Sequence, residues 1–507
     1  MSGIRPIKKV LVANRGEIAV RIMRTCRDMG IRSVAVYSEA DEKALHVRLA
    51  DEAWPIGPAP SSQSYLAADT ILAVAASCGA DAIHPGYGFL SESPEFAEAC
   101  RQQGIQFIGP PASAIRDMGD KTAARALMQK AAVPMAPGTT GAVNGQEDAL
   151  RVAEEIGFPV LIKAAAGGGG KGMRIVRSAE ALSDALSTAS REATSAFGDG
   201  RVFIEKYIDE PRHIEIQIMA DAHGNIVHLY ERECSIQRRH QKVIEEAPSS
   251  ILTPEVRSLM GEAAIRAARS CGYVGAGTVE FLLDSDMQFY FMEMNTRLQV
   301  EHPVTEWITG LDLVELQIRI AEGHTLPFTQ DQVSATGHAI ECRIYAEDPT
   351  SGFLPGPGTL LVHDPPSGPG IRLDSGVEEG AEIPVHYDPM ISKLIAWGTT
   401  REQAIARMVG ALGEYDIAGV PTTIGFCRYV MQHDAFVSGR FSTHFVDDHF
   451  TPDVLTVSNP SLGEDMAIAA ALYVDGDHRT APQQGPGPST PSAEYSPWHL
   501  RRRQREA

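Results

Sequence analysis

The sequence predicts a mixed α/β protein that opens with a doubly wound parallel sheet. Short apolar runs alternate with stretches of helical spacing over roughly the first 110 residues, and strands that alternate with helices form parallel sheets. Hydrophobic residues make up 43% of the chain and charged residues 22%, which is the balance of a globular protein. Because 507 residues exceed one ordinary domain, roughly two to four domains are expected.

Residues 1–120 are expected to form the parallel sheet as one domain. The apolar run at 9–13 predicts the first strand, and helical spacing follows from 18 to 29. Further strands are predicted at 33–37, 81–84 and 107–109. Since parallel sheets bind ligands at the carboxyl ends of their strands, the loops at 14–17 and 84–88 are expected near a ligand.

Residues 121–336 are predicted to form a second domain, with a small subdomain at 136–207. A helix at 122–131 leads into a bend rich in proline and glycine. The subdomain pattern indicates helices at 146–156 and 179–195 and strands at 159–163, 172–176 and 202–207. Its flanking Gly and Pro residues are typical of a mobile lid.

Two hairpins, at 213–232 and 278–294, and a helix at 254–270 complete the predicted second domain. Residues 337–450 mix strands, turns and a helix at 401–413, which predicts a third, β-rich domain. The tail at 451–507 is rich in Pro, Gly and Ser, is expected to be partly disordered, and has no assigned role.

Composition excludes several classes of protein. Lys and Arg number 45 against 65 Asp and Glu, a formal charge of −20, which argues against a nucleic-acid binder. The seven cysteines never form a C-x-x-C spacing, which disfavours disulfides and a cysteine-built zinc site. Neither a signal peptide nor an apolar run of about 18 residues is visible, so a cytoplasmic protein without membrane contact is expected.

A glycine-rich loop, Gly167-Gly168-Gly169-Gly170-Lys171-Gly172, follows a predicted strand. Such a loop lets backbone N–H groups surround phosphate oxygens, although a flexible loop tip is an equal alternative and the Walker pattern is absent. Five of the ten lysines fall at strand ends, turns or loops, where phosphate sites use them: Lys121, Lys163, Lys171, Lys206 and Lys242. Ordinary surface lysines are the alternative interpretation.

The second hairpin predicts a metal site. If its strands pair symmetrically about the turn, Glu280 lies opposite Glu293, Leu283 lies opposite Tyr290, and Asn295 shares the glutamates' face. Opposed carboxylates repel each other, and a dication would remove that repulsion. Two carboxylates and an amide oxygen are hard ligands suited to Mg²⁺ shared with phosphates. Two solvated glutamates on an exposed face are the alternative.

Polar residues follow directly on this strand. Arg297 can bind a small oxyanion bidentately, and Glu301 is a candidate general base. For His302, which precedes a proline, we favour a structural role. The stretch at 231–242 is dense in charged residues, and its simplest interpretation is a strand at a solvated sheet edge.

From about residue 7 to about residue 450 the chain resembles biotin carboxylase, an ATP-grasp component of acyl-CoA carboxylases. The resemblance rests on long motifs in the same order: residues 12–19, 84–92 and 118–121, the glycine loop, and residues 238–242 and 293–304. It implies an ATP-grasp domain with a mobile lid at 121–336 and a biotin carboxylase C-terminal domain at 337–450.

The resemblance also implies a role for each matching residue. ATP would be contacted by Lys121, Lys163, Gly169, Gly170, Glu205, Lys206, Tyr207, Ile208, His213, Gln237, His240, Glu280 and Glu293. About two Mg²⁺ or Mn²⁺ ions would be bound by Glu280, Glu293 and Asn295. Bicarbonate would contact Lys242, Arg297, Gln299 and the backbone of Val300, and would be deprotonated by Glu301. Arg343 would stabilise the biotin enolate.

The implied reaction passes through carboxyphosphate and ends with carboxylated biotin. No lysine lies beyond Lys393 and no Met-Lys-Met occurs, so we expect a separate biotin carboxyl carrier protein. Because 507 residues leave no room for a carboxyltransferase domain, we expect a separate carboxyltransferase subunit, and we also expect a homodimer. We expect acetyl-CoA as the final acceptor. The residues at 374–376 and 386–390 resemble those of propionyl-CoA, methylcrotonyl-CoA and pyruvate carboxylases, which are the alternative. Another ATP-grasp ligase and a non-catalytic nucleotide sensor are the rival hypotheses.

Overall fold

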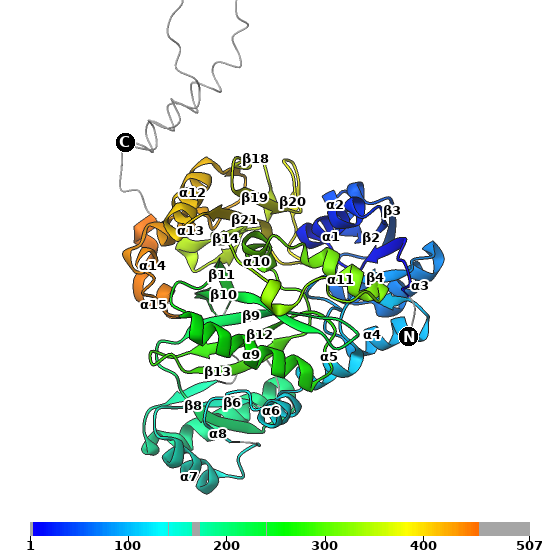
Figure 1. Ribbon diagram of the computed structural model, residues 1–507. Helices are drawn as coiled ribbons and strands as arrows, with labels where there is room; N and C mark the ends of the chain where they lie inside the picture. Colours follow the sequence, from blue (N-terminus) through cyan, green and yellow to red (C-terminus); the bar gives the residue numbers. More distant parts are fainter. Residues whose placement is uncertain (1–3, 140, 165–172, 240, 456–507) are drawn as a thin grey trace, which may run out of the picture. The chain divides into compact units, whose positions relative to one another are not determined.

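The N-terminal sheet of the computed structural model has five strands, all parallel, in the order β3-β2-β1-β4-β5 (Figure 1). The strands are β1 (Lys9–Val12), β2 (Arg32–Ser38), β3 (Glu52–Gly57), β4 (Ala82–His84) and β5 (Gln106–Phe107). The helices between and after them are α1 (Gly16–Asp28), α2 (Leu45–Leu49), α3 (Ala68–Cys78), α4 (Pro94–Gln102) and α5 (Ala112–Gly119). The doubly wound parallel sheet is thereby confirmed.

The structure describes residues 4–139, 141–164, 173–239 and 241–455. Strand β3 was not predicted, because Pro55 interrupts its short run, and strands that contain proline lie at sheet edges. Within the described ranges, no helix has the length and apolar character needed to cross a membrane.

The subdomain at 136–207 is a three-stranded antiparallel sheet covered by two helices. The strand order is β7-β6-β8, from β6 (Val160–Ala164), β7 (Arg174–Val176) and β8 (Val202–Lys206). Its helices are α7 (Gln146–Ile156) and α8 (Ala179–Phe197), and α6 (Lys121–Lys130) precedes it. The Asp120 carboxylate caps α6 by accepting from the Thr122 and Ala123 N–H groups, which fixes where that helix begins.

A second, eight-stranded antiparallel sheet runs through both the central and the C-terminal segments. Its order is β13-β12-β9-β10-β11-β14-β21-β19, from β9 (Arg212–Ala220), β10 (Ile226–Arg238), β11 (Gln241–Ala247), β12 (Gly275–Leu283), β13 (Phe289–Asn295), β14 (His338–Tyr345), β19 (Ile371–Ser375) and β21 (Met390–Gly398). The predicted hairpins are therefore part of a larger sheet that strands from residues 337–450 extend.

Helices and short strands surround this sheet. The helices are α9 (Pro254–Ser270), α10 (His302–Thr309), α11 (Leu313–Glu322), α12 (Arg401–Glu414), α13 (Ile424–Gln432), α14 (Asp434–Val437) and α15 (Phe445–His449). Short strands complete the C-terminal part: β15 (Glu347–Asp348), β16 (Leu354–Pro355), β17 (Gly358–Thr359), β18 (Val362–Asp364), β20 (Glu382–Ile383) and β22 (Asp416–Ala418). Alanines of α9, among them Ala263 and Ala267, pack with Ile214 and Ile216 of β9.

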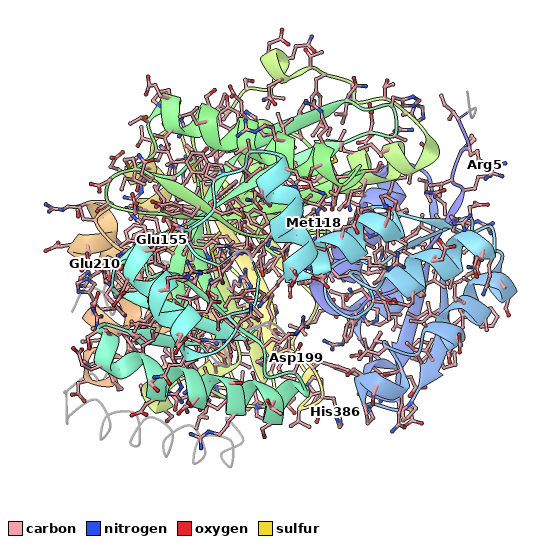
Figure 2. The ribbon with its side chains drawn as sticks, turned by 90° about the horizontal axis from the view of Figure 1, so that it is seen from below. Arg5, Met118, Glu155, Asp199, Glu210 and His386 are labelled. Atoms are coloured by element: carbon pink, nitrogen blue, oxygen red, sulfur yellow. The ribbon has the colours of Figure 1, made fainter. Side chains whose placement is uncertain are left out.

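The eight-stranded sheet buries a row of charged residues, although most of its core is apolar. Directly paired residues share a face, and the register pairs Glu280 with Glu215, Glu215 with Arg232, Glu245 with Glu341, Arg343 with Lys393, and Lys393 with Asp374. All of these side chains are buried. Exposed carboxylates such as Glu155 and Glu210 lie instead on the surface (Figure 2).

Candidate active site

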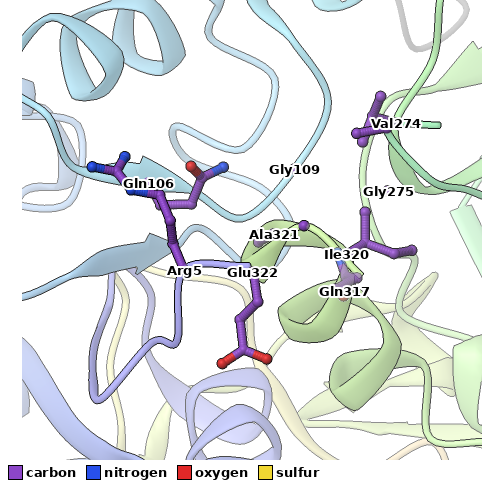
Figure 3. Close-up of a pocket in the computed structure, with 11 residues that line it drawn as sticks. Arg5, Gln106, Gly109, Val274, Gly275, Gln317, Ile320, Ala321 and Glu322 are labelled. Atoms are coloured by element: carbon purple, nitrogen blue, oxygen red, sulfur yellow. The ribbon is translucent and has the colours of Figure 1, made fainter. Parts of the chain in front are cut away.

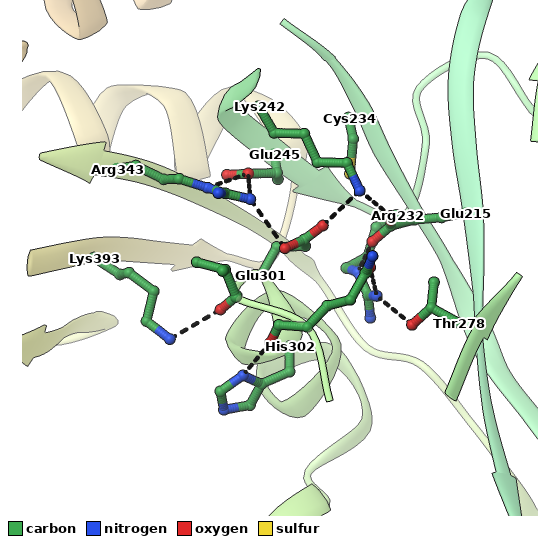
Figure 4. Close-up of polar contacts among 12 residues, drawn as sticks. Glu215, Arg232, Cys234, Lys242, Glu245, Thr278, Glu301, His302, Arg343 and Lys393 are labelled. Carbon is green, nitrogen blue, oxygen red and sulfur yellow. Dashed lines mark hydrogen bonds and ion pairs between the residues drawn. The ribbon is translucent and has the colours of Figure 1, made fainter. Parts of the chain in front are cut away.

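Lys242 of β11 lies at the centre of three buried carboxylates, and Figure 4 shows its contacts with two of them, Glu215 and Glu301. Its Nζ is 2.5 Å from Glu215 Oε2, 2.8 Å from Glu280 Oε1 and 2.8 Å from Glu301 Oε1. Glu215 and Glu280 come from paired positions of β9 and β12, and Glu301 from the turn before α10. Three strands and one turn thus bring one cation and three anions together.

These contacts fix the charge states. Burial by itself would lower the pKa of Lys242, but Glu215, Glu280 and Glu301 raise that pKa well above its ordinary value. Burial would raise the pKa of Glu301, but Lys242, Arg343 and Arg232 lower it well below the usual range. At neutral pH the ammonium is protonated and Glu301 is an ionised carboxylate.

Arg343 of β14 contacts the other oxygen of the same carboxylate. Its Nη2 lies 3.0 Å from Glu301 Oε2, and its Nε donates to Glu245 Oε1 at 2.7 Å. Each oxygen of Glu301 therefore contacts a different cation. This places Arg343, predicted from the resemblance alone, next to the candidate base.

Arg232 of β10 is a site residue that the sequence did not single out. Its guanidinium is fully buried, pairs with Glu215, and donates at 2.7 to 3.1 Å to Gln217, Thr278, Gln299 and Thr305. The part of the charged stretch at 231–238 is therefore a buried segment of the central strand β10, and its interpretation as a solvated edge is wrong. Residues 213–218 alternate polar and apolar, which is the pattern of a strand with one exposed face, but all nine residues of β9 are buried. The sequence therefore did not single out Glu215 as a buried charge.

The predicted pairing of Glu280 with Glu293 is confirmed, whereas that of Leu283 with Tyr290 is wrong. Leu283 pairs with Phe289, because a bulge between Glu280 and Phe281 shifts the register. Glu280 is buried, so the alternative of two solvated glutamates on an exposed face is also wrong. The Glu293 side chain, by contrast, is exposed.

The predicted metal ligands lie close together. Asn295 Nδ2 donates to Glu280 Oε1 at 2.9 Å, and the other Glu280 oxygen is 3.0 Å from His213 Nε2. Partial loss of hydration, followed by repulsion from Glu280, raises the pKa of Glu293. A divalent cation would relieve that repulsion, and oxygen ligands suit Mg²⁺, so these residues fit the ion.

Arg297 links Asn295 of β13 to Glu92, which lies between β4 and α4. Its Nε donates to Glu92 Oε2 at 3.0 Å and its Nη2 to Asn295 Oδ1 at 3.0 Å. Gln299 Nε2 donates to Glu280 Oε1 at 2.9 Å. Lys242, Arg297 and Gln299, the side chains predicted to contact bicarbonate, are therefore all linked by hydrogen bonds to Glu280 or its neighbour Asn295.

The residues predicted to contact ATP lie in two places. On the eight-stranded sheet, Gln237 Nε2 is 2.9 Å from His213 Nδ1. In the subdomain, Lys163 Nζ is 2.5 Å from Glu205 Oε2, whereas Lys206 Nζ donates at 3.1 Å to the backbone carbonyls of residues 157 and 158. Ile208 is buried, Tyr207 is half-buried, and Lys121 begins α6. Gly169, Gly170, Lys171 and His240 lie outside the described residues.

The loops at 14–17 and 84–88 bind each other. Asn14 Nδ2 donates to the Pro85 and Tyr87 carbonyls, each at 2.7 Å. Glu17 lies 3.2 Å from Lys393 of β21. These loops therefore connect the N-terminal sheet to the C-terminal strands. A separate pocket of 290 Å³, lined by residues such as Arg5, Gln106 and Glu322, contains none of the predicted site residues (Figure 3).

Three family descriptions match consecutive parts of the chain. Residues 6–115 match "Biotin carboxylase, N-terminal domain", residues 120–329 match "Carbamoyl-phosphate synthase L chain, ATP binding domain", and residues 341–448 match "Biotin carboxylase C-terminal domain".

Two relatives match over most of their length. The chain is 58% identical over 441 residues to one of the subunits of pyruvate carboxylase from Methanothermobacter thermautotrophicus, covering 87% of this chain and 90% of the relative. It is 54% identical over 444 residues to biotin carboxylase 1 of Bacillus subtilis, covering 87% and 99%. A third relative is longer than this chain. The chain is 54% identical over 481 residues to the methylcrotonoyl-CoA carboxylase alpha subunit of Oryza sativa, and the match covers 93% of this chain and 65% of the relative.

A solved structure is similar over the same region. The biotin carboxylase domain dimer of 2-oxoglutarate carboxylase from Hydrogenobacter thermophilus, in complex with MgADP, ADP and bicarbonate, superposes with a TM-score of 0.84 at 48% identity. The similarity covers 90% of this chain and 100% of that structure. The fold and the site define an ATP-grasp enzyme. The chain belongs to the biotin carboxylase family.

Proposed function

We propose that this chain carboxylates biotin attached to a separate carrier protein, with ATP as the energy source and bicarbonate as the carbon source. The observation that carries the proposal is the ionised carboxylate of Glu301, which contacts Lys242 on one oxygen and Arg343 on the other. The name of the Bacillus subtilis relative and the bicarbonate and MgADP bound in the Hydrogenobacter thermophilus structure support it.

In the first step, Glu301 removes the proton of bicarbonate, whose oxygen then attacks the γ-phosphate of ATP. The products are carboxyphosphate and ADP. Lys242, Arg297, Gln299 and the Val300 N–H group bind bicarbonate and orient it. When the anion draws Lys242 toward itself, Glu301 loses part of the interaction that depresses its pKa and becomes a stronger base.

ATP lies between the subdomain and the eight-stranded sheet in this proposal. The residues that would contact it are Lys121, Lys163, Gly169, Gly170, Glu205, Lys206, Tyr207, Ile208, His213, Gln237 and His240. Mg²⁺ or Mn²⁺ bound by Glu280, Glu293 and Asn295 would neutralise phosphate charge. The subdomain at 136–207 acts as a lid that excludes water from the labile carboxyphosphate.

In the second step, carboxyphosphate separates into CO₂ and phosphate. The phosphate takes the N1′ proton of biotin, and the Arg343 guanidinium stabilises the enolate that forms. N1′ then attacks CO₂ to give carboxybiotin. Arg343 is positioned for this by Glu245, which accepts its Nε–H at 2.7 Å.

Further parts of the proposal concern location and partners. We place the enzyme in the cytoplasm as a homodimer that works with a biotin carboxyl carrier protein and a carboxyltransferase subunit. Alignment with 90% of a relative named as a pyruvate carboxylase subunit supports the separate partners, and the dimer named in the Hydrogenobacter thermophilus structure supports the homodimer. Acetyl-CoA is one candidate acceptor; propionyl-CoA, methylcrotonyl-CoA and pyruvate are the alternatives, and the names of the relatives include two of these.

The test is ATP hydrolysis by the purified chain with Mg²⁺. Hydrolysis should depend on bicarbonate and rise further when free biotin is added. An ATP-grasp ligase of another kind would respond to a different acceptor, and a nucleotide sensor would not turn over at all. The acceptor is identified by supplying the carboxylated carrier and the co-purifying transferase with each acyl-CoA and with pyruvate in turn.

A further inference from the structure

Two buried side chains bind consecutive carbonyl groups in the turn before the candidate base. His302 Nδ1 lies 2.8 Å from the Gln299 carbonyl oxygen, and Lys393 Nζ donates to the Val300 carbonyl oxygen at 2.9 Å (Figure 4). Both side chains are fully buried. Since a carbonyl only accepts, Nδ1 of His302 carries the proton.

These carbonyls flank the proposed oxyanion donor. The Gln299 carbonyl and the Val300 N–H belong to one peptide group, and the Val300 carbonyl belongs to the next, which ends at Glu301. A hydrogen bond to a peptide carbonyl polarises the whole group, so its N–H becomes a stronger donor. Fixing both planes also fixes the direction in which the Val300 N–H points.

Lys393 connects this turn to two distant segments. Its ammonium lies 3.2 Å from Glu17 at the start of α1 and 3.8 Å from Asp374 of β19. Two residues after Asp374, Gly376 packs so closely on α1 that a Cβ there would collide with the Glu17 backbone nitrogen. This close approach needs glycine at the position, and it holds α1 against the strands that carry Lys393.

We propose that His302 and Lys393 are positioning residues that orient and polarise the Val300 amide for the substrate oxyanion. The inference rests on the proposed function, because it assigns this amide to bicarbonate. The inference also explains the segments at 14–17 and 374–376, which do not take part in the proposed reaction directly: they hold Lys393 in place. Neither side chain touches the reacting atoms.

The test compares His302→Leu with His302→Asn. Leucine keeps an apolar side chain but removes the donor, whereas the asparagine Nδ2 is as many bonds from Cα as the histidine Nδ1 and can still donate. His302→Leu should raise the KM for bicarbonate roughly tenfold and leave the KM for ATP within about twofold, and His302→Asn should restore most of the difference.

Lys393 is tested by Lys393→Met, alone and with Glu17→Gln, so that removal of the cation leaves no unpaired Glu17 charge. Both should raise the KM for bicarbonate as His302→Leu does. Thermal protection by bicarbonate in the presence of MgADP supplies a readout independent of turnover, and it should weaken in parallel.

Three results would overturn the inference. One is equal behaviour of His302→Leu and His302→Asn. Another is a parallel rise of both KM values with a lower melting temperature, which would mark a general structural role. The third is an unchanged KM for bicarbonate in all variants, measured while the wild-type chain hydrolyses ATP in a bicarbonate-dependent way. A wild-type chain that neither turns over nor is protected by bicarbonate would overturn the proposed function itself and the inference with it.

Discussion

At the scale of single residues, two buried glutamates near the site have pKa values that are shifted in opposite directions. Lys242 and Arg343 keep Glu301 ionised. Neither oxygen of Glu341 has a hydrogen-bond partner among the described residues. Burial raises the pKa of Glu341 well above its ordinary value, and the nearby Lys393 does not offset that effect. Burial thus favours the neutral form of Glu341, which is the opposite of the effect that Lys242 and Arg343 have on Glu301.

This difference predicts opposite results for the same substitution. Glu301→Gln removes the base and should lower bicarbonate-dependent ATP turnover by about a hundredfold or more. Because burial favours the neutral form of Glu341, Glu341→Gln, which introduces a neutral group of the same shape, should leave kcat within about twofold. Steady-state kinetics at pH 7.5 measures both, and equal losses would contradict the assigned charge states.

Glu17 provides a prediction about pH and stability. Burial, only partly offset by Lys393, raises the pKa of Glu17 to about 7 from an ordinary value of 4.5. Between these values the unfolded chain loses the proton while the folded chain keeps it. The free energy of unfolding should therefore fall as pH rises through this window, by up to about 1.4 kcal/mol per pH unit, and level off above it.

Glu17→Gln removes this contribution because glutamine does not titrate. The melting temperature of the variant relative to wild type should rise from pH 5 to pH 7.5, as measured by differential scanning calorimetry. Parallel pH profiles for the two proteins would contradict the shifted pKa.

At the scale of elements, the hairpin of β12 and β13 carries the predicted metal ligands. Glu293→Gln removes one anionic ligand and should raise the Mg²⁺ concentration needed for half-maximal ATP turnover by about tenfold. Asp286→Asn is the matched control, since this exposed residue in the turn of the same hairpin makes the same change in charge. Equal shifts for both variants would indicate a general charge effect instead of ligation.

This hairpin also shows how far sequence reasoning reaches. Symmetric pairing correctly placed Glu280 opposite Glu293, but it missed the bulge, because residues 289–292 are all apolar or aromatic and show no alternation that an extra residue could interrupt. In strand β9 the period of two is present at residues 213–218, but it predicts a polar face in solvent, whereas both faces of the strand are buried. Arg232 and Glu245 become visible only when the register brings distant strands together. The parallel sheet was predictable because its signals are local.

At the scale of the whole molecule, the acidic net charge and the cationic interior are separate properties. The chain carries a formal charge of −20, yet Lys242, Arg232, Arg343 and Lys393 lie in the interior, each beside carboxylates. Composition alone therefore excludes a class of partner but does not describe the potential at the site, which depends on where the fold places a few cations.

The described site lies wholly within residues 1–455, which form one compact unit. A chain that ends at Leu455 should therefore keep kcat and both KM values within about twofold of the full chain, because every contact of the site remains. The measurement is bicarbonate-dependent ATP turnover of the two proteins side by side. A loss beyond tenfold would show that residues 456–507 take part in catalysis.

The three carboxylates around Lys242 have one more chemical consequence. The proposed reaction releases CO₂ close to a primary amine, and amines react with CO₂ to form carbamates only when they are unprotonated. Glu215, Glu280 and Glu301 keep this amine protonated by raising its pKa. The same charges that hold the lysine in place thus make it unreactive toward the enzyme's own intermediate, so carbon dioxide is left for biotin.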